Sequence, residues 1–183
     1  MVAGWQAGWG LNSNGKAQIM NLAKRLSLSN IRAIYTSPLE RAMETAQLLA
    51  EVHHLTPIVR EGLGEMRVGR WEGRTFESLR NDARWQRFNT VRTTEFPPDG
   101  ERMIEVQARI ARESEEIRLR HPDETVAVVS HGDPLRALVS YYLGIPIDLI
   151  QRFEIGLASV TTIRFDDNRP VLLCLNDTGE LSV

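Results

Sequence analysis

The chain has 183 residues, of which 42% are hydrophobic and 25% are charged, and its formal net charge is −2. These values fit one globular domain with a sizeable core, expected over residues 1–183, and argue against a general binder of nucleic acid or membrane surfaces. A single cysteine, Cys174, excludes an internal disulfide and a cysteine-based metal site. It is typical of a reducing compartment, so we expect a cytoplasmic protein without a membrane span.

The first third of the sequence alternates amphipathic segments with short apolar runs. In chain order we expect a Gly- and Trp-rich loop over residues 1–10, a helix over 15–26 capped by Ser13 or Asn14, a strand at 31–36, a helix starting at Ser37-Pro38 and a strand at 58–59. Trp5 and Trp9 would lie on a pocket rim or against the body of the protein.

The remainder continues the alternation. We expect an ordered loop over 63–73, a helix over 76–88, a break at 95–100, a helix over 101–120 capped by Asp99, a buried strand at 125–129, a helix capped by Asp133, and closing strands at 158–165 and 171–175. Arg and Glu on the outer face of the long helix are expected only to solvate it. The pattern predicts an α/β fold, a three-layer α/β/α sandwich with a mostly parallel sheet.

His131 and Gly132 fall where the strand at 125–129 meets the following helix. Ligands of open α/β sheets bind at the carboxyl ends of strands, and a helix N-terminus there favours an anion. An imidazole at this seam is placed to meet a phosphate. The alternative is a structural histidine with its hydrogen bonds satisfied.

Two other residues are candidates on weaker grounds. Arg41 lies in the first turn of its helix, where a cation is unfavourable unless an anion binds beside it; the alternative is a solvated surface arginine. Glu65 is a carboxylate in the loop at 63–73, and such groups are usually solvated. We find no cluster of metal ligands, since His53 and His54 are adjacent and point in different directions.

Three separated motifs resemble those of the histidine phosphatase superfamily, also called phosphoglycerate mutase-like. Ser37-Pro38-Leu39-Glu40-Arg41-Ala42-Met43-Glu44-Thr45-Ala46 is similar to the family's helix start, Leu63-x-Glu65-x-x-x-Gly69-x-Trp71-Glu72-Gly73 to its acid-bearing loop, and Val129-Ser130-His131-Gly132 to its second catalytic histidine. The motifs come in the expected order and span most of the chain. The resemblance therefore implies a phosphoglycerate mutase-like fold and favours functional roles for Arg41, Glu65 and His131.

In this family a histidine attacks phosphorus to form a phosphohistidine, which water or a second alcohol then resolves. The resemblance implies that Arg41, His131 and Gly132 bind the phosphate, and that His131 and Glu65 are catalytic. Glu65 would be the general acid for the leaving alcohol and then the base for water, with its pKa raised. No metal or other cofactor is required, and the partner would be a phosphorylated small molecule.

The sequence departs from the family at its start, because the strand that ends in Arg-His-Gly and carries the nucleophile is missing. Arg120-His121 is followed by proline and precedes a strand, so it is no substitute. We expect an N-terminally incomplete domain, inactive as given. Its first strand, central in the sheet, would be missing, leaving it marginally stable or completed by another copy in a homodimer.

The function expected from the family is phosphomonoester hydrolysis, and whether this chain is an enzyme depends on the missing nucleophile. One alternative is a non-catalytic pseudoenzyme that binds a phosphate ligand; another is phosphoglycerate mutase-type transfer, disfavoured by the short stretch between Gly73 and Asp99. In-frame DNA upstream of Met1 encoding a strand and Arg-His-Gly would favour the enzyme. An unrelated nucleotide-binding domain lacks support because no Gly-rich phosphate loop follows a strand.

Overall fold

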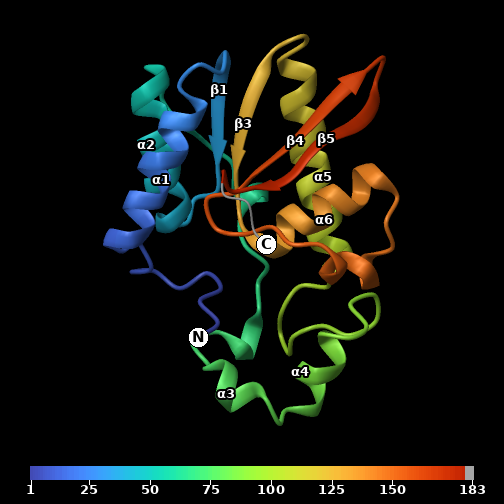
Figure 1. Ribbon diagram of the computed structural model, residues 1–183. Coiled ribbons are helices and arrows are strands. Elements are labelled where there is room, and N and C mark those ends of the chain that lie inside the picture. The colour runs from blue at the N-terminus through green and yellow to red at the C-terminus, as the bar shows by residue number, and fades with distance from the viewer. Residues whose placement is uncertain (180–183) are drawn as a thin grey trace.

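The computed structural model describes residues 1–179 (Figure 1). Its α-helices are α1 (Ser13–Leu26), α2 (Glu40–His53), α3 (Phe76–Leu79), α4 (Ala83–Phe88), α5 (Met103–Arg120) and α6 (Gly132–Leu143). Its strands are β1 (Ile31–Thr36), β2 (Ile58–Val59), β3 (Thr125–Val129), β4 (Val160–Asp166) and β5 (Arg169–Asp177). Three 3-10 helices, η1 (Glu61–Leu63), η2 (Gly69–Trp71) and η3 (Ile147–Arg152), lie in the connections. The predicted order of strands and long helices is confirmed, whereas the 3-10 helices were not predicted.

Helix starts differ from the expected caps. Asn12, rather than Ser13 or Asn14, caps α1 by accepting a hydrogen bond from the Gly15 N–H at 2.8 Å. The helix expected from Ser37-Pro38 begins later, at Glu40, because the Ser37 hydroxyl accepts the Leu39 N–H.

The two later helices also begin at other residues. Arg102, not Asp99, precedes α5, and its N–H donates to the Glu105 side chain. Asp99 instead pairs with Arg70 at 2.6 Å. His131 is the N-cap residue of α6, which places Asp133 inside the first turn.

The three-layer architecture follows from the side chains of β1. Ile31 and Ile34 pack with buried residues of α1 and α2, including Leu22 and Leu49. Ala33 and Tyr35 face the other way and pack with Ile110 and Ile117 of α5 and Leu138 of α6. Parallel pairing joins the strands in the order β2-β1-β3. The sheet therefore has a helical layer on each face, as the sequence predicts.

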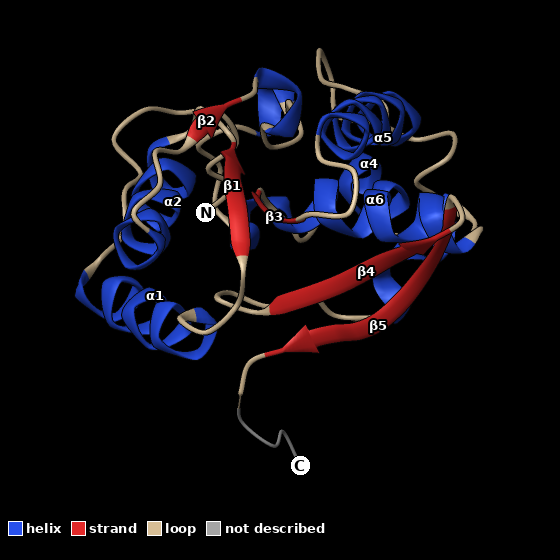
Figure 2. Cartoon of the chain, turned by 90° about the horizontal axis from the view of Figure 1, so that it is seen from above, coloured by secondary structure: helices blue, strands red, loops and turns tan. Residues whose placement is uncertain are grey.

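The second sheet is the antiparallel hairpin β4–β5, which lies apart from β1 and β3 in the view from above (Figure 2). Within residues 1–179, β3 pairs with β1 alone and β4 with β5 alone. The prediction that β3 is buried is wrong, because its last four residues, all apolar, are only half-buried. β3 and β4 thus each have one edge that no described strand pairs.

A small region of loops and short helices covers one end of the sandwich. The single helix expected over 76–88 is two helices, since Asp82 interrupts it and caps α4 through the N–H groups of Arg84 and Trp85. Leu79 and Phe88 are buried, whereas Ala83 is exposed. Trp71, Phe88 and Met103 belong to one core cluster, which joins this region to α5 and α6. No helix in the described residues is long and apolar enough to cross a membrane.

Candidate active site

The three candidate side chains come from segments that leave the same edge of the sheet. Because β1 and β3 are parallel and in register to their last residues, Thr36 and Val129, their carboxyl ends coincide. Arg41 follows β1 in the first turn of α2, and His131 follows β3. Glu65 comes two residues after η1, in the loop that follows β2. This edge is the usual ligand position of an open α/β sheet.

His131 is held in place and kept neutral. Its side chain is buried, with 7% of the residue exposed, and its Nε2 lies 2.7 Å from Ser37 Oγ. Burial and the positive charges of Arg41 and Arg109 lower the pKa of His131 to about 3. At neutral pH the imidazole is therefore uncharged, with one ring N–H to donate and one ring nitrogen to accept.

Arg41 presents a donor that has no acceptor. Its Nη2 donates to the Gly4 carbonyl at 3.0 Å, while Nη1 is buried and has no hydrogen-bond partner among the described residues. Burial lowers the pKa of Arg41, and the Glu65 carboxylate opposes that effect. An arginine pKa starts so high that the group stays charged. A buried guanidinium N–H without a partner is costly, and an anion is the ligand that would satisfy it.

Glu65 has the environment of a carboxyl that can hold a proton near neutral pH. Burial, and then the negative charge of Asp133, raise its pKa to about 7. The Met66 N–H, which donates to Glu65 Oε1 at 2.8 Å, and the charges of Arg41 and Arg109 work in the opposite direction. The positive charge of Arg41 lowers the pKa of both Glu65 and His131, so Arg41 lies within electrostatic range of each. The structure thus brings these three side chains into one charged neighbourhood.

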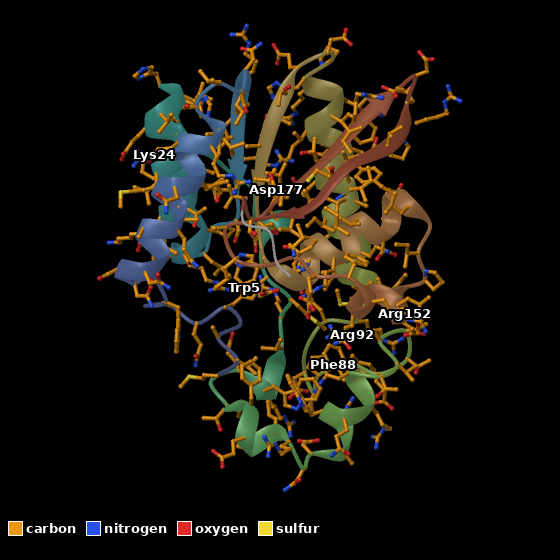
Figure 3. The ribbon with its side chains drawn as sticks, viewed as in Figure 1. Trp5, Lys24, Phe88, Arg92, Arg152 and Asp177 are labelled. Carbon is orange, nitrogen blue, oxygen red and sulfur yellow. The ribbon has the colours of Figure 1, made fainter. Side chains whose placement is uncertain are left out.

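The N-terminal segment lies across this site. The Trp5 indole donates to the Glu65 carbonyl at 2.6 Å, and the Arg67 guanidinium lies 3.9 Å from the centroid of the Trp5 ring. Trp5 therefore packs against the body of the protein, as expected, at the end of the sheet where β1 and β3 stop (Figure 3). Trp9 is 39% exposed. An alanine at Gly64 would place its Cβ 2.3 Å from the Trp5 ring, so glycine is needed there.

The start of α6 adds Gly132 and Asp133. A Cβ on Gly132 would meet no heavy atom closer than Arg136 Nη1 at 3.5 Å, so space alone does not require glycine. Asp133 pairs with Arg92 at 2.8 Å, and the Arg92 guanidinium lies 4.2 Å from the ring centroid of Phe88 (Figure 3). The covering region around α4 is thereby tied to the helix that begins at the site.

The other histidines lie away from this edge. His121 bonds Tyr35 and Glu124 at the turn before β3, the opposite end of that strand. His53 and His54 lie at the far end of the 14-residue α2 from Arg41, a helix of about 20 Å at 1.5 Å of rise per residue. Among the described residues, no group of three or more His, Cys, Asp or Glu is arranged to hold a metal ion.

Sequence reasoning missed two arginines near the site, Arg92 and Arg109. The expectation that charged residues of the long helix only solvate it is wrong for Arg109, which donates to the carbonyls of Gly62, Gly64 and Glu65. The sequence did contain an indication that Arg109 faces inward, because it stands directly beside Ile110, a residue of the apolar stripe of α5. Arg92 gives no such signal, because its segment has no regular period.

Comparisons with known proteins identify the family and the fold. Phosphoserine phosphatase 1 of Hydrogenobacter thermophilus is 34% identical over 176 residues, covering 93% of this chain and 82% of the relative. The structure of Bacillus stearothermophilus YhfR superposes with a TM-score of 0.90 at 32% identity, covering 96% of this chain and 88% of that one. A phosphoserine phosphatase mutant from Entamoeba histolytica, in complex with phosphoserine, gives a TM-score of 0.87 at 27% identity, covering 99% and 90%. The model of the histidine phosphatase superfamily (branch 1) matches residues 2–178, and the chain belongs to that superfamily.

Proposed function

We propose that this chain binds a phosphate monoester at the edge of the sheet where Arg41, Glu65 and His131 meet, and that the reaction of its fold is phosphomonoester hydrolysis. The observation that carries the proposal is the buried Arg41 Nη1, a charged donor without an acceptor. A phosphate oxygen supplies that acceptor with the planar geometry that arginine prefers. His131 adds a neutral donor from the other strand end, and Gly132 adds the N-terminus of α6.

In the proposed reaction a histidine nitrogen attacks phosphorus and the bond from phosphorus to the alcohol oxygen breaks. The leaving alkoxide takes the proton of the Glu65 carboxyl group. Water then attacks phosphorus, the bond from the histidine nitrogen to phosphorus breaks, and inorganic phosphate is released. The water gives a proton to Glu65, which regenerates the acid. A Glu65 pKa of about 7 supports both steps, since each protonation state is accessible near neutral pH.

The nucleophile is the part that the described residues do not provide. His131 is fixed to Ser37 and takes the phosphate-binding role, and the remaining histidines lie away from the site. We therefore propose that the chain as given binds phosphate esters without hydrolysing them. On its own the chain would thus be a phosphate-ligand binding protein without catalysis. For a protein that has the nucleophile, hydrolysis is the proposed reaction and mutase-type transfer is the alternative.

We propose that the missing central strand, which would carry the nucleophile, belongs between β3 and β4. Each of those strands has an edge unpaired within residues 1–179, and Ala127 and Val129 of β3 pack on the same core cluster as Val160 of β4. A homodimer that completes this gap and a cytoplasmic location are further proposals. Light scattering across a concentration series tests the first, and cell fractionation the second.

Hydrolysis of an aryl phosphate tests the proposed inactivity. The chain should release phosphate no faster than its His131→Ala variant, because neither has the attacking group. Clear turnover that depends on His131, with a trapped phosphoenzyme, would show that another nucleophile is present. Calorimetry with inorganic phosphate tests binding: Arg41→Ala should weaken it by about tenfold or more, the value of one charge-assisted hydrogen bond, and unchanged affinity would remove Arg41 from the site.

A further inference from the structure

The loop that carries Glu65 has little regular structure of its own to hold it. It consists of the 3-10 helix η1, then Gly64 and Glu65 in extended conformation or without assigned structure. The Glu65 carboxyl takes its orientation from its own backbone, because Oε1 accepts the neighbouring Met66 N–H at 2.8 Å. Whatever fixes the backbone here therefore also fixes the carboxyl.

Three side chains from outside the loop donate to that backbone: Trp5 to the Glu65 carbonyl, Ser130 to the Leu63 carbonyl, and Arg109, which makes the largest number of contacts. Arg109, from the middle of α5, donates from Nη1 to the carbonyls of Gly62 at 2.9 Å and Gly64 at 2.8 Å, and from Nη2 to the carbonyl of Glu65 at 2.9 Å. Three carbonyls within four residues thus converge on one guanidinium. Such an arrangement replaces the ladder that a helix or strand would supply.

Through Glu101, the same guanidinium also holds the backbone at Arg67, two residues after Glu65. It binds Glu101 through Nε at 2.9 Å and Nη2 at 3.0 Å. Glu101 Oε2 in turn accepts the Arg67 N–H at 2.7 Å, and the Glu101 N–H donates to the Arg67 carbonyl at 2.8 Å. The backbone is therefore held both at Glu65 and two residues beyond it.

All five N–H donors of Arg109 are used in this way. Nε and the two Nη groups meet five acceptors, three from the loop and two from Glu101. The pair is well shielded, with side-chain exposures of 15% for Arg109 and 19% for Glu101. A lysine has three donors on a flexible stem and could not make the same set of contacts.

We propose that Arg109 is the positioning residue for Glu65. It fixes the backbone on both sides of that residue, so that the carboxyl is held beside the bound phosphate ester, and it places a permanent positive charge next to the acid. This proposal rests on the proposed role of Glu65. The charge has a supporting effect, because Arg109 opposes the rise in the pKa of Glu65 and adds to the fall in that of His131.

The chain offers a matched control in Arg60. This residue also links the start of η1 to α5, through Glu113 and Glu116, but it makes no contact with the Glu65 carbonyl. Arg60→Met should therefore remove a link of the same kind between η1 and α5 while leaving the backbone at Glu65 and Met66 in place. Arg109→Met removes both the charge and the donors, whereas Arg109→Lys keeps the charge.

The experiment is a carbon-13 NMR titration of the glutamate carboxyls in the free protein, with Glu65 assigned from Glu65→Gln, combined with hydrogen exchange at the Met66 amide. In Arg109→Met we expect Glu65 to titrate at a higher pH than in the parent, and Met66 to exchange at least about tenfold faster. Arg109→Lys should keep the titration near that of the parent yet exchange faster at Met66. Arg60→Met should change neither.

Unchanged titration and exchange in Arg109→Met would overturn the proposal. Equal changes in Arg60→Met would overturn it as well, because general loosening would then be the cause. The measurement needs neither substrate nor turnover, so it separates this proposal from the proposed function. If Arg109 behaves as expected but Glu65→Gln leaves the pH dependence of phosphate binding unchanged, Arg109 still positions Glu65, and the acid role of Glu65 is wrong.

Discussion

Replacing Glu65 with glutamine should stabilise the protein, and more so as the pH rises. Glu65 has a folded-state pKa of about 7 against an ordinary value of 4.5. Because the folded value is the higher one, ionisation penalises the folded state: the penalty is absent below the ordinary pKa and complete above the folded one. A tenfold change in an ionisation constant is worth about 1.4 kcal/mol, so the complete penalty is about 3 kcal/mol.

The pH dependence of this penalty can be measured by urea unfolding. Between about pH 5.5 and about pH 8.5 the penalty grows by about 2 kcal/mol, and Glu65→Gln should remove that growth because an amide does not ionise. The control is Glu72→Gln, a carboxyl of the same loop that accepts the Trp5 N–H. If the unfolding free energy of Glu65→Gln ran parallel to that of the parent across this range, the Glu65 carboxyl would not be a buried acid, and its proposed role would fail.

Three other predictions concern residues around the site. His131 has a pKa lowered to about 3, so stability should fall as the pH drops below the ordinary histidine value, and acid unfolding of His131→Gln should be less steep; equal steepness would contradict the burial of a neutral imidazole. Asp133→Asn should lower the pKa of Glu65, because the Asp133 charge raises it, and an unchanged NMR titration would contradict that coupling. Gly69→Ala should lower the unfolding free energy by about 2 kcal/mol or more, since its φ is +50° and a Cβ would lie 2.0 Å from the Pro98 carbonyl oxygen; a melting temperature equal to that of the parent would contradict this.

Strong periodic signals made most of the fold predictable. The strand at Ile31–Thr36 is found with its predicted bounds. The long helix is found close to its predicted range, and its apolar side chains at helical spacing are buried: Met103, Val106, Ile110 and Ile117. Helix starts were less predictable, because several capping residues compete locally and tertiary contacts decide among them. Asp99 illustrates this, since it pairs with Arg70 and leaves the start of α5 to Arg102.

The candidate site was predictable for those residues that lie in the three sequence motifs. Arg41, Glu65 and His131 stand out because each lies in a motif with fixed spacing, and the parallel strands bring their segments to one edge. Arg109 was less predictable, because three of its five acceptors are backbone carbonyls, which any residue type provides, and only its position beside Ile110 indicated burial. The separation of the strands into the β2-β1-β3 sheet and the β4–β5 hairpin was also not predictable. Strand propensity does not tell which strands pair with each other.

The crystal structure of the chain soaked with tungstate, a heavy tetrahedral dianion that mimics phosphate, tests the convergence of Arg41, Glu65 and His131 most directly. We predict one strong anomalous peak at the carboxyl ends of β1 and β3, within hydrogen-bond distance of Arg41 Nη1 and of a His131 ring nitrogen, with the Glu65 carboxyl beside it. A peak elsewhere, or an anion at this edge that Arg41 does not contact, would contradict the account.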